Sequence, residues 1–168
     1  FLIHGLQKVY PSTNKEHAML SILASGWRMQ LFLSTKQTMQ EKHLFEYAVI
    51  RVVPQVEREE YINVGVILYC KQQQFLDARW ALDERLMALF APHLDLAELK
   101  LNLCAFDIIC KGGPEGGTIG MLDMPGRFRW LTATRSTILQ PSSVHPGYTD
   151  DASATLEKLF QQLVMRGK

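Results

Sequence analysis

The chain of 168 residues is 47% hydrophobic and 21% charged, the balance of an ordinary globular protein with one hydrophobic core. Its formal net charge of +1 argues against the broad basic surface of a nucleic-acid-binding protein. No apolar run reaches the roughly 18 residues that a transmembrane helix needs, so we expect no membrane partner.

The three cysteines, Cys70, Cys104 and Cys110, are too widely spaced to indicate a disulfide framework or a zinc site. Each lies in an apolar run, where a free cysteine behaves as a small hydrophobic side chain. We therefore expect three reduced, buried thiols and a cytoplasmic protein, because reducing compartments keep thiols free. The five histidines are scattered without ligand spacing, so we expect no metal and no cofactor.

The first 38 residues differ in pattern from the rest of the chain. Residues 11–14 form a turn signal, residues 17–32 have the loose apolar spacing of a weak amphipathic helix, and residues 34–38 are polar. Two interpretations stay open: a short helix packed on the domain, or a weakly structured N-terminal extension of the kind common at chain ends. From residue 39 the pattern is regular, so residues 39–168 are predicted to form a single domain.

Three strands are predicted at the start of this domain. Apolar and β-branched residues fill 44–53, 61–70 and 75–81, and Pro54 ends the first run. The connections between the runs are short. We therefore expect the strands to pair in chain order as an antiparallel meander.

Two helices follow, each with an aspartate at its N-terminus. Asp83 is the expected N-cap of a helix through Phe90, and Asp95 that of a helix over 96–110, because a carboxylate accepts hydrogen bonds from the free N–H groups of a first turn. In the second helix, apolar residues recur at helical spacing. They are Leu99, Leu103, Phe106 and Cys110.

The last third of the chain is predicted as a loop, a strand, turns and a helix. Residues 111–126 hold six glycines and indicate a loop, whereas the aromatic, Thr and aliphatic side chains of 128–139 favour a fourth strand. Residues 140–150 are rich in turn formers. A helix then runs from an aspartate cap at 150 or 151 to about residue 165.

This order of elements indicates an α+β protein. We expect an antiparallel sheet, made of the three-strand meander plus a later strand, with helices packed on one face.

The second strand determines which face of the sheet is core. Its other face carries Asn63 and Gly65, both disfavoured inside strands, and such a glycine often marks a bulge or a close approach. If the registers align, Arg51, Asp77 and Arg79 gather beside Asn63, as a solvated face with a cross-strand ion pair or as part of a site. Alternation places the apolar residues on the core face: Ile62, Val64, Val66, Leu68 and Cys70.

A basic and aromatic stretch follows the glycine-rich loop. In the predicted strand, Arg129 and Arg135 share one face, with Arg127 and Ser136 nearby, while Trp130 lies on the other. Planar guanidinium groups bind phosphate and carboxylate through paired hydrogen bonds. The stretch is therefore either an anion site or a set of structural salt bridges around a core tryptophan.

Two weaker motifs are interpreted as structural. Residues 112–118 almost match the phosphate-binding loop, but the lysine is missing and the segment follows a helix instead of a strand. Ser142 and His145 lie near Asp150 and Asp151 but lack the elbow sequence of a nucleophilic serine. We expect a flexible loop and a turn at these positions.

Several stretches together resemble one protein family. They are Phe45-Glu-Tyr-Ala-Val-Ile-Arg-Val-Val-Pro54, Tyr61-Ile-Asn-Val-Gly-Val-Ile-Leu-Tyr69, Ala81-Leu-Asp-Glu-Arg85, Arg127-Phe-Arg-Trp-Leu-Thr-Ala133, Arg135-Ser-Thr137 and Gln140-Pro-Ser142. Over about residues 40–164 the chain is similar to the bacterial domain of unknown function 3037 family. The resemblance implies a cytoplasmic bacterial protein and no particular activity. Members of the family are often encoded beside a HipA-like kinase, which implies a kinase-like partner.

Two function hypotheses result. The first is an accessory or interaction domain that acts with a HipA-like kinase encoded nearby. The alternative is a phosphate- or nucleotide-binding domain, or an enzyme, that holds a phosphorylated small ligand with converging arginines. The candidate anion-binding residues are Arg51, Asn63, Arg79, Arg127, Arg129, Arg135 and Ser136.

Overall fold

A computed structural model gives the structure of residues 41–135 and 137–165. The chain divides into two units, Phe1–Glu41 and Lys42–Lys168, and the strands and helices of the described residues belong to the second. The extension or short helix expected over residues 1–38 lies outside the described residues.

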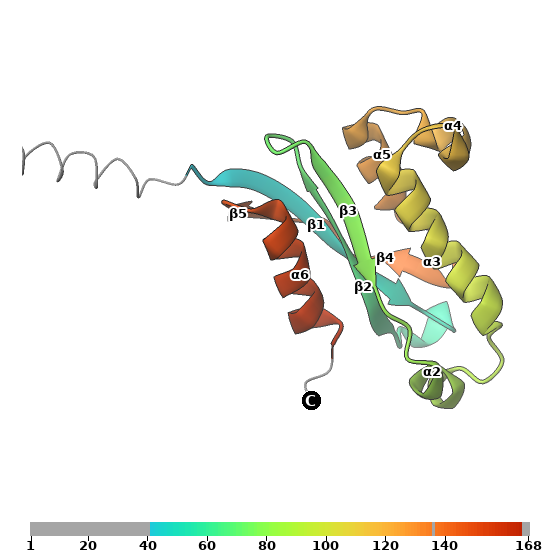
Figure 1. The fold of residues 1–168 in the computed structure, drawn as a ribbon. Coiled ribbons are helices and arrows are strands. Elements are labelled where there is room, and N and C mark those ends of the chain that lie inside the picture. Colours follow the sequence, from blue (N-terminus) through green and yellow to red (C-terminus); the bar gives the residue numbers. More distant parts are fainter. Residues whose placement is uncertain (1–40, 136, 166–168) are drawn as a thin grey trace, which may run out of the picture. The chain divides into compact units, whose positions relative to one another are not determined.

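An antiparallel sheet of five strands forms the centre of the second unit (Figure 1). The α+β class and the antiparallel meander are confirmed, but two later strands join the sheet instead of one, and both pair with β1. The sheet order is β3-β2-β1-β4, with β5 also on β1. The strands are β1 (His43–Val52), β2 (Ile62–Cys70), β3 (Phe75–Trp80), β4 (Leu139–Pro141) and β5 (His145–Thr149), and a short 3-10 helix, η1 (Val56–Arg58), lies between β1 and β2.

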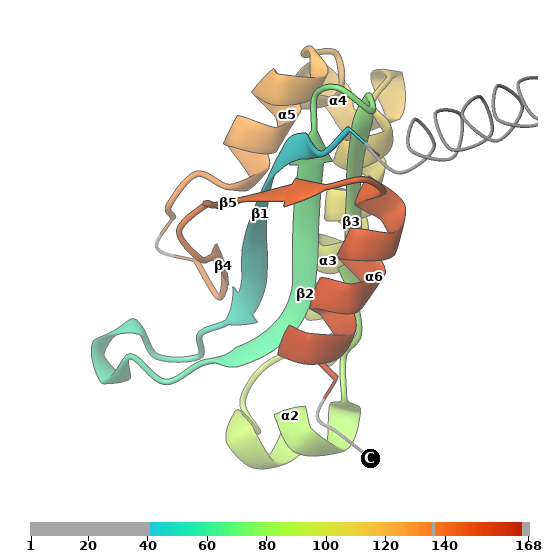
Figure 2. The same ribbon diagram turned by 90° about the vertical axis from the view of Figure 1, so that its left-hand side faces the viewer.

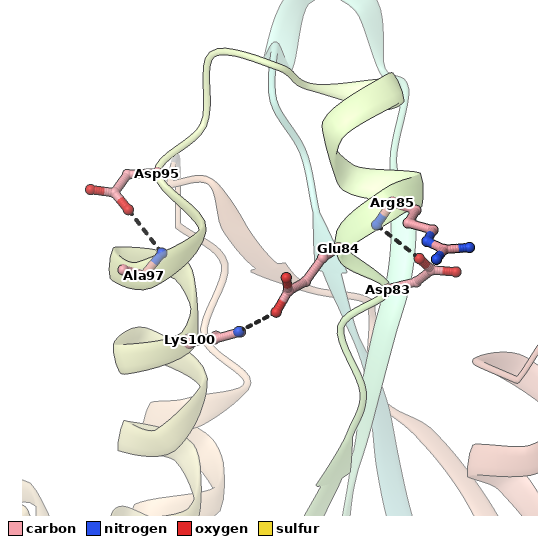
Figure 3. Close-up of polar contacts among 6 residues, drawn as sticks. All are labelled: Asp83, Glu84, Arg85, Asp95, Ala97 and Lys100. Carbon is pink, nitrogen blue, oxygen red and sulfur yellow. Dashed lines mark hydrogen bonds and ion pairs between the residues drawn. The ribbon is translucent and has the colours of Figure 1, made fainter.

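The two helices after the meander begin at the predicted caps. Asp83 Oδ1 accepts a hydrogen bond from Arg85 N at 3.0 Å, and Asp95 Oδ1 accepts one from Ala97 N at 2.8 Å (Figure 3). An ion pair between Glu84 and Lys100 joins these two helices. The helices are α2 (Glu84–Phe90), α3 (Leu96–Lys111), η2 (Pro114–Gly116), α4 (Gly117–Gly120), α5 (Met124–Leu131) and α6 (Ala152–Leu163).

A β-bulge in β2 makes the prediction of a single apolar face wrong. Ile50 pairs with Gly65 and Arg51 with Asn63, which leaves Val64 as an extra residue. Alternation therefore reverses within the strand. Ile62, Val64, Ile67 and Tyr69 join one core cluster, whereas Val66, Leu68 and Cys70 join another.

Gly65 lies at this bulge because the neighbouring strand leaves no room for a side chain. A Cβ atom at this position would lie 2.8 Å from Trp80 Cβ and 2.9 Å from Arg79 O. Both features expected of a mid-strand glycine, a bulge and a close approach, are confirmed.

Helices cover both faces of the sheet, so the expectation of helices on one face is wrong. α3 and α5 pack on the face that bears Ile67 and Tyr69, and α6 packs on β2 and β3 from the opposite side (Figures 1 and 2). The bulge is the physical reason, because it divides the apolar side chains of β2 between the faces and each face then needs a cover.

The strand predicted at residues 128–139 is wrong, because α5 occupies its first part. Asp123 is the N-cap and accepts a hydrogen bond from Gly126 N, and Pro125 lies in the first turn, where helices tolerate proline. Phe128 and Leu131, spaced by three residues, are buried. The loop expected at 111–126 likewise contains η2 and α4, and the turn region at 140–150 contributes β4 and β5.

All three cysteines are free, as expected, but only Cys70 and Cys110 are buried. Cys104 is exposed, which corrects the expectation of three buried thiols. Cys104 lies on the side of α3 that faces away from the sheet, since the sheet side is taken by Leu99, Leu103 and Cys110.

Candidate functional site

Arg51 and Asn63 are cross-strand partners in β1 and β2, so they share a face of the sheet. Arg51 Nη2 donates to Pro141 O at 3.2 Å, and its guanidinium lies 4.7 Å from the centre of the Tyr61 ring. Asn63 Nδ2 donates to Leu163 O at 3.0 Å and so satisfies a free carbonyl at the end of α6. Both side chains have structural partners.

Arg79 lies on the same sheet face, and its side chain contacts α6. Its Nε lies 3.1 Å from Glu157 Oε2. This ion pair joins β3 to α6, and it is exposed enough that its contribution to stability is small.

The arginines of the basic stretch lie on the opposite side of the sheet, in and after α5. Arg127 Nη1 donates to Leu122 O at 3.0 Å and Nη2 to Cys110 O at 3.4 Å, which ties α5 to the end of α3. Arg129 is exposed on α5. Arg135 donates to Trp130 O, and its guanidinium lies 3.8 Å from the centre of the Trp130 ring.

The predicted anion-binding residues are therefore not gathered at one place. Arg51, Asn63 and Arg79 lie on the α6 side, and each contacts a different group. The other arginines belong to the α5 side. Ser136 lies outside the described residues. Among five pockets of the described residues, none contains more than one of these arginines.

The two weaker motifs have structural roles. Ser142 Oγ accepts a hydrogen bond from Val49 N at 2.9 Å and donates to Ser143 O, while the His145 ring lies 5.3 Å from that of Tyr47. In the glycine-rich segment, a Cβ atom at Gly112 would lie 2.5 Å from Arg127 Nη1, and the φ of +77° also favours glycine.

Within residues 41–135 and 137–165, no group of three His, Cys, Asp or Glu side chains is placed to hold a metal ion. Among the helices of the same residues, none has the length and the apolar character required to cross a bilayer.

The outer face of α3 is apolar and has no described partner. Leu101 is 72% exposed and Ile108 is 37% exposed, and Cys104 and Ala105 lie between them at helical spacing. The opposite face of the helix is buried through Leu99 and Leu103. A helix that is apolar on both sides is normally covered on both sides, so this stripe is a candidate binding face.

A pocket of about 460 Å³ opens beside this stripe. α3 lines it with Asn102, Ala105 and Phe106, α5 with Trp130, and the segment before β4 with Ile138. Ala105 lies one helical turn from Leu101, so the stripe and the pocket are continuous. We call the two together the α3 surface: Glu98, Leu101, Asn102, Cys104, Ala105, Phe106, Ile108, Trp130, Arg135 and Ile138.

Charged groups on this surface lie at the pocket. Glu98 and Arg135 both line it. The guanidinium of Arg135 stacks on the Trp130 ring and donates to Trp130 O, so it holds that ring in place. The surface therefore combines an apolar floor with one side chain of each charge, which is the composition of a protein-binding patch.

Three titratable groups near the sheet have shifted pKa values. Burial raises the pKa of the Cys110 thiol above its usual 9.0, with added effects of Asp77 and Asp107, so this thiol stays protonated. Burial also raises the pKa of Asp107, although the hydrogen bond from Trp80 opposes the rise. The pKa of Tyr69 is raised mainly by burial and then by Glu46.

Sequence reasoning missed the α3 surface. The residues Leu101, Cys104, Ala105 and Ile108 recur at intervals of three, one and three, which is itself a helical stripe. This second stripe was the available signal. Trp130 lines the pocket because residues 124–131 form a helix. The strand predicted from residue 128 could not place Trp130 beside α3.

Residues 47–164 match the family described as protein of unknown function (DUF3037), and the chain belongs to this family. The expected family relationship is thereby confirmed. Comparison with curated proteins and with solved structures finds no match.

Proposed function

We propose that this member of the family is a protein-interaction domain and that its partner, a HipA-like kinase encoded nearby, binds the α3 surface. The observation that carries the proposal is the exposed apolar stripe of α3, which adjoins a pocket of about 460 Å³. Leu101 is 72% exposed in the middle of a well-formed helix, where burial by a partner removes apolar area from water.

The composition of the pocket supports a protein partner over a charged small ligand. Its described lining has two aromatic side chains, aliphatic side chains and an amide, with one carboxylate and one guanidinium. Binding energy at such patches is concentrated in a few aromatic and arginine residues around an apolar centre. A large aliphatic or aromatic side chain of the kinase fits the pocket between Phe106 and Trp130.

The alternative, a phosphorylated small ligand, requires guanidinium groups that converge. Instead, Arg51 contacts Pro141, Arg79 contacts Glu157 and Arg127 contacts Cys110. Because these guanidinium groups do not converge, we do not propose this function.

Co-purification tests the proposal. The kinase is tagged and expressed together with the full chain, either unchanged or with Leu101→Glu or Ile108→Glu. Ala154→Glu is the matched control, because it puts the same charge on an exposed position of α6, on the opposite sheet face. We expect Leu101→Glu and Ile108→Glu to weaken binding at least about tenfold and Ala154→Glu to leave it unchanged.

Two results would overturn the proposal. If the unchanged chain does not co-purify with the tagged kinase, the kinase is not the partner. Binding that survives both glutamate substitutions in α3 removes the α3 surface as the binding site.

A further inference from the structure

The outer edge of β3 has backbone groups without a strand partner. Among the described strands, only β2 pairs with β3. Ala81 N donates to Val64 O at 2.8 Å, and N–H groups alternate between the two sides of a strand. The N–H and C=O groups of Leu76, Ala78 and Trp80 therefore point away from β2.

A groove of about 640 Å³ runs along this edge. Residues 77–81 form its floor, Asp107 and Lys111 of α3 line one side, and Phe160 and Met165 line the other. In Figure 1, β3 is seen between α6 and α3. The two helix layers thus flank the free edge of β3, where an added strand would pair.

Two carboxylates give this groove its charge. Asp77 Oδ1 accepts a hydrogen bond from Ala78 N at 2.9 Å. Ala78 N is the middle one of the three N–H groups on the free edge. Asp107 Oδ2 accepts one from Trp80 Nε1 at 3.1 Å. Arg79 is already paired with Glu157, which leaves Lys111 as the cation among the described lining residues. With Glu157 included, three carboxylates stand against the two cations Arg79 and Lys111, so the excess charge is negative.

The two carboxylate side chains come from opposite sides of the groove. Asp77 shares the sheet face of Arg79, whose side chain reaches α6, whereas Asp107 belongs to α3. Successive side chains of an extended segment also point to opposite faces. Two adjacent basic residues in one strand would therefore each meet one carboxylate.

We propose that the groove along β3 binds an extended segment of a partner protein as an added strand, with two adjacent basic residues set against Asp77 and Asp107. On binding, Ala78 N exchanges the Asp77 carboxylate for a carbonyl of the segment, and the released carboxylate pairs with a basic side chain. Leu76 and Trp80 supply the flanking backbone hydrogen bonds. The groove is distinct from the α3 surface, so this inference does not depend on the kinase.

A second copy of the chain does not fit as the occupant. α3 packs mainly on β3. Pairing two β3 edges would bring the two α3 helices to about one strand spacing, ~4.8 Å, whereas packed helices need about 8–10 Å between axes. A single strand without attached helices has no such conflict.

The test is an NMR titration of the full ¹⁵N-labelled chain with the peptide acetyl-Thr-Val-Lys-Lys-Val-Thr-amide. Two control peptides are used: one with glutamates for the lysines, and one with every backbone nitrogen methylated. We expect the lysine peptide to shift the amide signals of Leu76, Ala78 and Trp80. Both control peptides should bind at least about tenfold more weakly.

The double variant Asp77→Asn with Asp107→Asn keeps the shape of both side chains. Its affinity for the lysine peptide should fall to the affinity that the unchanged chain has for the glutamate peptide. Leu101→Glu should leave peptide binding unchanged, which separates this site from the α3 surface. The inference is overturned if the lysine peptide leaves these three amides unmoved at millimolar concentration. It is also overturned if the methylated peptide binds the unchanged chain as tightly as the lysine peptide does. The same holds if the double variant binds the lysine peptide as tightly as the unchanged chain does.

Discussion

Two leucines of α3, two residues apart, provide a sharp test of which face of this helix is covered. Leu103 is 0% exposed and Leu101 is 72% exposed. Removing the Leu103 side chain leaves a cavity in the core, so Leu103→Ala should lower the free energy of unfolding by about 2–5 kcal/mol. Full burial of a leucine is worth up to about 3 kcal/mol, and Leu101 is 72% exposed, so Leu101→Ala should cost less than about 0.8 kcal/mol.

Urea unfolding of the full chain, followed by far-ultraviolet circular dichroism, measures both changes. The slope of the unfolding free energy against urea should stay constant, so the difference is read from the midpoint. If Leu101→Ala destabilises as much as Leu103→Ala, then something already covers the outer face of α3 in the free protein. The argument for a binding face would then be refuted.

Three further outcomes are expected. Gly65→Ala should lower the unfolding free energy by about 1–3 kcal/mol, measured by urea unfolding, because the added methyl group meets Trp80 Cβ at 2.8 Å; a stabilised variant would contradict the tight contact. Burial raises the pKa of Asp107 above 3.8, and Asp77 adds to the rise. The folded state therefore favours the protonated carboxyl, and the free energy of unfolding should fall as the pH rises from 3.8 through the folded pKa. Asp107→Asn should abolish that decline in a pH series of unfolding midpoints, and an unchanged profile would contradict the assignment. A maleimide reagent should label Cys104 in the native protein and spare Cys110, which mass spectrometry of the digested protein checks; equal labelling would mean that Cys110 is not buried.

The elements that local sequence determines were predicted well. The meander follows from three apolar runs with short connections, and α2, α3 and α6 begin at aspartates whose carboxylates accept first-turn N–H groups. These signals lie within a few residues of the elements they define. For that reason they do not depend on how the rest of the chain packs.

The errors came from features that depend on more than one segment. The bulge at Val64 is a property of the register between β1 and β2, and one extra residue transferred Val66, Leu68 and Cys70 to the other face. The face assignment then followed the wrong alternation. A helix on each side of the sheet was the consequence.

The helix α5 illustrates a conflict between two local signals. The aromatic residues of 128–130 favour a strand, while Asp123 as cap and Pro125 in the first turn favour a helix. The cap determined the structure, since Phe128 and Leu131 then both reach the core. The arginines consequently project from a helix and a loop, which is why the expected cluster does not form.

Cross-linking from Cys104 tests most directly whether the α3 surface binds a partner. Cys104 lies on the outer face of α3, and it is the exposed cysteine among the three. A benzophenone maleimide attached there should cross-link to the co-expressed HipA-like kinase on illumination, and the same reagent on Ala154→Cys in a Cys104→Ser background should not. A kinase that binds but cross-links only from position 154 would contradict the account.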